Sequence, residues 1–288
     1  MAIKISLGVC IALGCMSAIA ADNRPDRSQQ FAALPNWTGI WEGEVASEMR
    51  TDEFGKVMDE AAAHPQSIPT VAPPGVLSAQ EAFVISRTQL DQPPPYNAEW
   101  QRIYKQRDRK IRATPASAVK PGSIMACEWD FPELMDNPFD TLFQIYITPE
   151  ETLLLFVNGQ ARHIYTDRSH PGADDLWPTA LGNSVGHWEG DTLKIDTIER
   201  RAGPFVRIPH VLSPDLSEQA RYTESIHLVD PDTLQDDMTI EDAQRLSRPW
   251  TLTLKFHRVK NLDRLIPTDC TENNRFQVIG GRYTITSH

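Results

Sequence analysis

The sequence lacks several features that would indicate particular classes of protein. It has no excess of basic residues, because 39 Asp and Glu outnumber 28 Lys and Arg and give a net charge of −11. Affinity for phosphates requires a basic face, so this balance argues against a nucleic-acid-binding protein. Hydrophobic residues make up 40% of the chain and charged residues 23%, a composition that excludes both wholesale disorder and a protein with many membrane spans.

Long apolar runs are scarce, and the one that opens the chain predicts export. Lys4 precedes an apolar stretch over residues 5–19, and Ala18-Ile19-Ala20 supplies the small residues of a cleavage site. The stretch is short for a bilayer core, so we expect residues 1–20 to be a signal peptide with no transmembrane segment left after its removal. The sequence thus predicts a periplasmic or secreted protein. A lipoprotein anchored through Cys15 is the alternative.

Cysteine is also scarce, with four residues in the whole chain. Cys10 and Cys15 lie in the predicted signal peptide, which leaves Cys127 and Cys270. Two cysteines in an oxidising compartment are expected to pair, and a bridge across so long a loop contributes on the order of 4–5 kcal/mol in the chain-entropy model. A nucleophilic cysteine is the alternative.

Sequence motifs for metal and serine chemistry are missing. The eight His residues form no His-x-His or His-Glu-x-x-His pattern. Residues 182–186 (Gly-Asn-Ser-Val-Gly) match the letters of a nucleophile elbow, but they open an antiparallel hairpin instead of a strand–turn–helix unit. We therefore expect neither a metal nor another cofactor.

Strand patterns dominate the chain after a Pro-rich front. We expect a polar, flexible arm over 21–33 and a single domain over 34–288, with a Pro-rich, helical insertion at about 58–120. The insertion holds a helix opened by the capping box at Ser78 and a second helix over Ala98–Arg112. About nine strands are expected in the body, at 36–43, 141–148, 152–157, 160–166, 185–189, 192–197, 221–229, 234–240 and 250–259, with another short one near 275–279. Short turns and no repeating βα unit favour an antiparallel barrel or sandwich.

Two turns predict strand register. A two-residue turn at Asn158-Gly159 sets Leu155 opposite Arg162 and Leu154 opposite His163, with His163 and Tyr165 on the face of Leu154. A two-residue turn at Gly190-Asp191 places Trp188 on the face of Leu193. The turn at 230–233 leaves Asp236 opposite either His227 or Leu228, according to its length. Asp236 and Glu224 are acidic residues in strands that are otherwise apolar at that parity.

Several motifs resemble a family of secreted bacterial proteins. They are the segment Ile-Tyr-Thr-Asp-x-x-His-Pro at 164–171, the segment Gly-x-Ser-x-Gly-x-Trp-Glu-Gly-Asp-Thr-Leu at 182–193 and the paired cysteines, the second of which opens Cys-Thr-Glu-Asn-Asn at 270–274. That family has no established activity. The resemblance implies a β-barrel similar in outline to lipocalins. We therefore predict a mainly β protein, an antiparallel lipocalin-like barrel of about 8–10 strands with one or two helices near its N-terminus.

Candidate site residues cluster around one strand and the loop after it. Asp167 and His170 follow the strand that carries His163 and Tyr165, where barrels place ligand contacts. His170 oriented by Asp167 is a candidate general base, and His163 and Tyr165 are candidate proton donors or acceptors. Turn formation by Asp167 and solvent exposure of His170 are the plain alternatives. The candidate ligand contacts are Arg162, as an anion clamp, and Trp188, Trp41 and Glu272.

Two function classes follow from this cluster. The first is a barrel that binds a small hydrophobic or aromatic molecule. The second is a cofactor-independent lyase, isomerase or hydrolase that acts on such a molecule through the His, Asp and Tyr group. An envelope-interaction protein using the basic face of the helix at 98–112 is a third possibility. The sequence leaves the oligomeric state open.

Overall fold

The computed structural model describes residues 26–44, 94–113, 129–135, 142–205, 213–265, 276–279 and 282–285. The predicted signal peptide, the helix expected at Ser78, and Cys127, Cys270 and Glu272 lie outside these residues. The chain divides into a unit over Met1–Ala33 and a unit over Leu34–His288. In the first, helix α1 (Arg27–Ala32) occupies part of the segment expected to be an arm.

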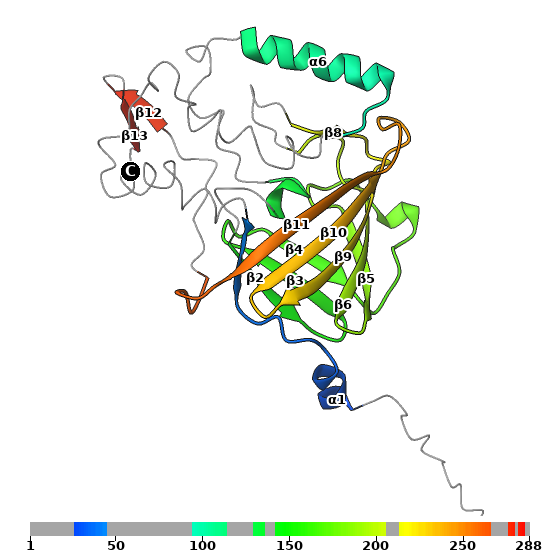
Figure 1. The fold of residues 1–288 in the computed structure, drawn as a ribbon, viewed down its shortest axis with the longest axis vertical. Helices are drawn as coiled ribbons and strands as arrows, with labels where there is room; N and C mark the ends of the chain where they lie inside the picture. The colour runs from blue at the N-terminus through cyan, green and yellow to red at the C-terminus, as the bar shows by residue number, and fades with distance from the viewer. Residues whose placement is uncertain are drawn as a thin grey trace, which may run out of the picture. The chain divides into compact units, whose positions relative to one another are not determined.

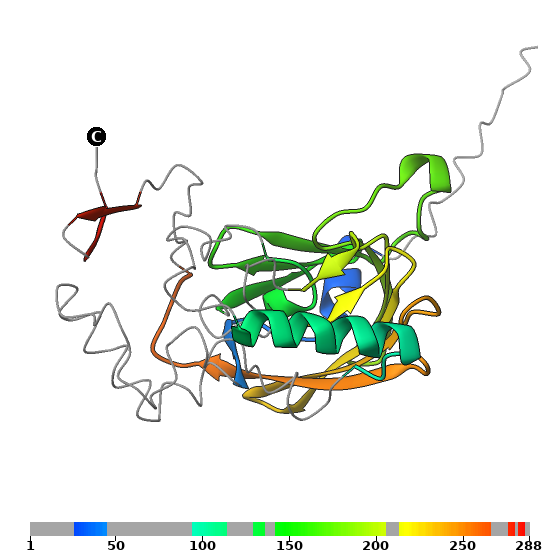
Figure 2. The same ribbon diagram turned by 90° about the horizontal axis from the view of Figure 1, so that it is seen from above.

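The body of the second unit is a closed barrel of nine strands in the order β1-β11-β10-β9-β6-β5-β4-β3-β2, which confirms the predicted fold class. The strands surround one interior, seen from the side in Figure 1 and from above in Figure 2. Their bounds are β1 (Ile40–Gly43), β2 (Phe143–Ile147), β3 (Glu151–Phe156), β4 (Ala161–Tyr165), β5 (Asn183–Glu189), β6 (Thr192–Ile198), β9 (Arg221–Asp230), β10 (Thr233–Glu241) and β11 (Trp250–Val259).

Smaller elements accompany the barrel. Helix α6 (Ala98–Ala113) matches the helix predicted over 98–112, and the side chain of Asn97 accepts a hydrogen bond from the backbone N–H of Trp100 at its first turn. None of the described helices has the length and apolar character needed to cross a bilayer. The remaining elements are the strand pairs β7 (Gly203–Pro204) with β8 (Asp215–Leu216) and β12 (Phe276–Ile279) with β13 (Arg282–Ile285), and the 3₁₀ turns η2 (Glu133–Met135) and η3 (Ala173–Asp175).

One strand pair departs from the predicted antiparallel arrangement. β4 and β5 run parallel, and their ladder contains two residue pairs, Ile164 with Ser184 and Tyr165 with Val185. The connection between them spans residues 166–182, which is long enough to return the chain to the same end of the sheet, as a parallel pair requires. The barrel is therefore mixed, and the β4–β5 ladder, like that of β1 with β2, contains only two residue pairs.

The β3–β4 turn is one residue longer than predicted, and this corrects the register. The N–H of Phe156 bonds to the carbonyl of Gln160, the N–H of Gly159 bonds back to the carbonyl of Phe156, and Gly159 has a φ of 85°. This is a three-residue loop with a left-handed glycine, and it pairs Leu154 with Arg162. Arg162 therefore faces the interior, whereas His163 and Tyr165 face outward, the reverse of the predicted faces.

The structure confirms the predicted turn of the β5–β6 hairpin but not the predicted register of β9 and β10. Gly190-Asp191 forms the predicted two-residue turn, and Trp188 pairs with Leu193. The register of β9 and β10 matches neither predicted alternative, because a bulge lies between the pairs Thr233–Asp230 and Leu234–Leu228. Asp236 consequently lies opposite Ile226 and faces the interior, and the possible pair with His227 does not form.

Aromatic side chains fill both ends of the barrel. Near the β5–β6 turn, Trp37 packs edge-on against Trp188 with ring centroids 5.0 Å apart, and the indole N–H of the buried Trp41 bonds to the carbonyl of Trp37. At the other end Phe131, which precedes η2, packs against Tyr222 at 5.1 Å. The predicted lining residues Trp41 and Trp188 thus close one end of the barrel.

The segment that leads into η2 is held by the buried Arg200 and the partly exposed Arg201. The guanidinium of Arg200 is fully buried, donates to the carbonyl of Phe131 at 3.1 Å and pairs with Asp130. Arg201 pairs with the same carboxylate. These bonds fix Phe131 and η2 over the end of the interior that contains Arg162.

Candidate functional site

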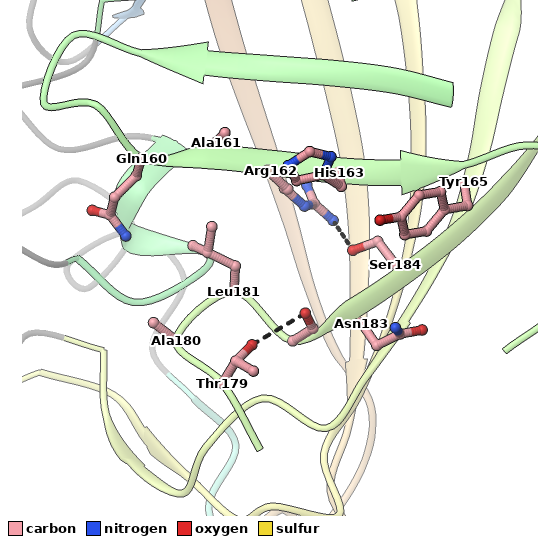
Figure 3. Close-up of a pocket in the computed structure, with 11 residues that line it drawn as sticks. Gln160, Ala161, Arg162, His163, Tyr165, Thr179, Ala180, Leu181, Asn183 and Ser184 are labelled. Carbon is pink, nitrogen blue, oxygen red and sulfur yellow. Dashed lines mark hydrogen bonds between the residues drawn. The ribbon is translucent and has the colours of Figure 1, made fainter. Parts of the chain in front are cut away.

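A groove of about 360 Å³ opens in the barrel wall where β4 and β5 diverge. One side is β4 with the preceding Gln160, and the other is the segment 179–184, which includes the start of β5 (Figure 3). We call it the lateral groove. It is lined by Gln160, Ala161, Arg162, His163, Tyr165, Thr179, Ala180, Leu181, Gly182, Asn183 and Ser184.

The wall opposite β4 depends on a glycine. Gly182 has a φ of 71°, and a Cβ built there would lie 2.7 Å from the carbonyl oxygen of Ile198. Only glycine combines this backbone conformation with so close an approach to a neighbouring strand. The carbonyl of Gly182 also accepts a hydrogen bond of 3.2 Å from the hydroxyl of Thr179, which closes the turn.

Replacing this glycine should loosen the wall of the lateral groove. We expect Gly182→Ala to lower the free energy of unfolding by about 1–3 kcal/mol, because it combines a strained φ with a backbone clash. Gly172→Ala is the matched control, since nothing lies within 4 Å of a Cβ at Gly172, and it should change stability by less than about 0.5 kcal/mol. Urea unfolding of both variants checks this, and equal losses would contradict it.

Arg162 lies behind the groove and extends into the barrel, where it is 1% exposed. Its Nη1 donates to Glu224 at 2.8 Å, and its Nη2 donates to the second oxygen of that carboxylate and to Thr197 at 3.0 Å. A longer bond of 3.4 Å joins Nη2 to Ser184, which also lines the groove (Figure 3). The guanidinium carbon lies 4.0 Å from the centroid of the Phe131 ring.

Asp236 adds a second carboxyl group beside Glu224. Burial and the neighbouring charge of Glu224 raise the pKa of Asp236 well above its usual value. The interior thus holds one guanidinium and two carboxyl groups, and the raised pKa of Asp236 favours the neutral form of that acid. We call Arg162, Glu224, Asp236, Ser184 and Thr197 the interior polar cluster.

His163 and Tyr165 line the lateral groove from the outer face of β4. The Nδ1 atom of His163 is in hydrogen-bond contact with the carboxylate of Glu151 on β3, and the side chains are 49% and 29% exposed. The rings of His163 and Tyr165 stack with centroids 6.1 Å apart. The structure therefore brings these two predicted residues together and adds Glu151.

His170 and Asp167 occupy different surroundings. Asp167 pairs with its exposed neighbour Arg168, whose hydrogen bond lowers the pKa of that carboxyl. His170 contacts the Asn183 side chain through Nδ1 at 2.7 Å and the Asp196 carboxylate through Nε2 at 3.0 Å. Because both ring nitrogens have partners, neither is free to take a proton from a ligand, and Asp167 is not the residue that orients His170.

Asp196 links His170 to the surface of β9. Partial burial alone would raise its pKa, but hydrogen bonds from Arg221 and His170 outweigh this and lower the pKa below its usual value. Arg221 reaches the carboxylate with bonds of 2.6 and 2.8 Å. His170 therefore attaches the segment after β4 to the outer face of β6.

The sequence did not single out Glu151, Gln160, Thr179, Asn183 and Ser184 as site residues. The available signal is the position of Glu224 and Asp236 in otherwise apolar strands, which is also compatible with surface salt links and does not by itself reveal a polar interior. Among the described residues no three His, Cys, Asp or Glu side chains gather closely enough to hold a metal ion.

Comparisons with known proteins found no matching family model, no matching curated protein and no matching solved structure. The resemblance to a family of secreted bacterial proteins therefore stays a prediction. What can be argued about function comes from the geometry of the lateral groove.

Proposed function

We propose that the protein binds a small aromatic molecule in the lateral groove. The observation that carries this proposal is a groove of about 360 Å³ that combines apolar walls with hydrogen-bonding side chains. Small-molecule sites have this volume and this mixture, with a few polar groups that orient the ligand. The apolar part comes from Ala161, Ala180 and Leu181, and the polar part from His163, Tyr165 and Asn183.

The side of the barrel suits a ligand better than its centre does. A lipocalin-like carrier would hold an apolar ligand inside the barrel. In this protein the buried side chains of Trp41, Phe143, Phe156 and Phe256 occupy that interior. Phe143 contacts both other Phe rings with centroids 5.2 to 5.3 Å apart. The proposed ligand therefore lies against the wall, beside the interior polar cluster.

A second candidate function is acid–base catalysis without a cofactor on the same kind of molecule, as a lyase, isomerase or hydrolase. The observation that favours it is the contact of Glu151 with His163, since a carboxylate that orients an imidazole is a common arrangement for proton transfer. His163 and Tyr165 would be the catalytic residues, and Glu151 the positioning residue.

Filling the groove tests the binding proposal. Ala161 is at the groove on β4, so Ala161→Phe should weaken binding of the probe 2-methoxynaphthalene by at least about tenfold through steric exclusion. Thr251→Phe places the same ring at an exposed position of β11 away from the groove and should leave affinity within about twofold. Fluorescence titration gives both affinities. Unaltered binding by Ala161→Phe, or no binding by the unmodified protein, would overturn the proposal.

A further inference from the structure

The lateral groove contains an imidazole nitrogen, Nε2 of His163, that can accept a hydrogen bond because a neighbouring carboxylate fixes the ring hydrogen on the other nitrogen. A carboxylate only accepts hydrogen bonds, so the contact of Glu151 with Nδ1 of His163 places the ring hydrogen on Nδ1. In the neutral ring Nε2 is then the acceptor. No hydrogen-bond partner of Nε2 is found among the described residues, and His163 lines the groove.

Tyr165 provides a complementary group beside this acceptor. Its ring is stacked on His163 at an interplanar angle of 21°, and it lines the same groove (Figure 3). Arg168 covers its ring, with the guanidinium carbon 4.8 Å from the ring centroid. The phenolic hydroxyl can donate one hydrogen bond, and no partner for it is found in the described part of the chain.

We infer that the ligand of the lateral groove carries a phenolic hydroxyl group, which donates to Nε2 of His163 and accepts from Tyr165. This inference rests on the proposed binding function and specifies its ligand class. The aromatic body of such a ligand would contact Leu181 and the two alanines of the groove.

Electrostatics favour a phenol over the related classes. The negative charge of Glu151 strengthens His163 as an acceptor, and an acceptor of this kind gains most from an acidic hydroxyl donor. A carboxylic acid is ionised at neutral pH, so it would have no hydrogen to donate to Nε2. An ether or a plain hydrocarbon would leave the Nε2 atom without a partner.

The test compares 2-naphthol with 2-methoxynaphthalene, which differ in the hydroxyl hydrogen that His163 would accept. We expect the unmodified protein to bind the naphthol about tenfold more tightly, the difference that one satisfied hydrogen bond makes. His163→Phe keeps a ring against Tyr165 but removes the acceptor, so the preference for the naphthol over the ether should fall to about twofold or less. Glu151→Gln should reduce the preference partially, because a neutral partner remains on Nδ1.

His187→Phe is the matched control. His187 also contacts a carboxylate, that of Glu189 at 3.1 Å, on an exposed face that does not line the groove. Its replacement should leave the preference unchanged. Equal affinity for the two compounds, or a preference that survives His163→Phe, would overturn the phenol inference and leave the binding proposal standing. No binding of either compound would overturn the binding proposal, and the inference with it.

Discussion

Replacing Arg162 with Met should destabilise the protein by about 3–5 kcal/mol, because it leaves the buried carboxylate of Glu224 without its cation. The pair is fully enclosed, with side-chain exposures of 1% for Arg162 and 0% for Glu224. Met retains much of the volume of Arg, so the loss would come mainly from the unpaired charge and the lost hydrogen bonds to Thr197 and Ser184. Chemical denaturation at pH 7 measures it.

A double variant separates the charge from the packing. Arg162→Met combined with Glu224→Gln removes both charges and leaves Asp236 beside a neutral amide. We expect this variant to recover at least about half of the loss, because replacing both members of a buried ion pair costs less than breaking it. A single variant that loses less than about 1 kcal/mol would show that Glu224 is not a buried carboxylate held by Arg162.

Asp236→Asn should remove a pH dependence of stability that the natural side chain imposes. The folded pKa of Asp236 lies above the unfolded value, so the native state keeps a proton that the unfolded state has released. The contribution of this group is fully present below the unfolded pKa, about 3.9, and falls as the pH rises toward the folded pKa. In that window the free energy of unfolding declines by about 1.4 kcal/mol for each pH unit.

Asparagine is neutral at every pH, and its amide places hydrogen-bond donors beside Glu224. The stability of Asp236→Asn relative to the unmodified protein should therefore rise with pH above about 4, by about 1.4 kcal/mol per unit until the folded pKa is reached. Asp237→Asn is the control variant, because Asp237 lies on the exposed face of the same strand, where its carboxylate accepts hydrogen bonds from Gln235 and Thr253. Denaturation of both variants from pH 4 to pH 8 tests this; parallel profiles for Asp236→Asn and the unmodified protein would contradict it.

Local patterns were sufficient for the strands. The alternation of Trp250–Val259 and the residues around Gly190 predicted β11 and the β5–β6 hairpin, because side-chain parity and turn chemistry are properties of a few neighbouring residues. The same logic predicted helix α6 within one residue of its observed end. The predicted register of β3 and β4 was wrong, because the loop between them is one residue longer than expected. This difference exchanges the faces on which Arg162 and His163 lie.

The candidate site was only partly predictable. Arg162, His163 and Tyr165 were singled out and do lie together at the lateral groove, but Asp167 and His170 are not joined to them by a hydrogen bond or ion pair among the described contacts. Glu151 was overlooked because its relation to His163 depends on the pairing of β3 with β4.

Composition and local patterns establish an acidic, mainly β chain with short turns and two acidic residues in otherwise apolar strands, and they predict a signal peptide. Only the three-dimensional arrangement reveals the parallel β4–β5 pair, the groove that opens where this pair diverges, and the pairing of Arg162 with Glu224. It also buries Asp236 beside Glu224, which raises the pKa of Asp236. The physical reason is range. Helix and strand propensity, side-chain alternation and turn chemistry depend on residues close together in the sequence. The interior polar cluster instead brings together side chains from five strands, β4, β5, β6, β9 and β10, and these side chains become buried together only when the barrel closes.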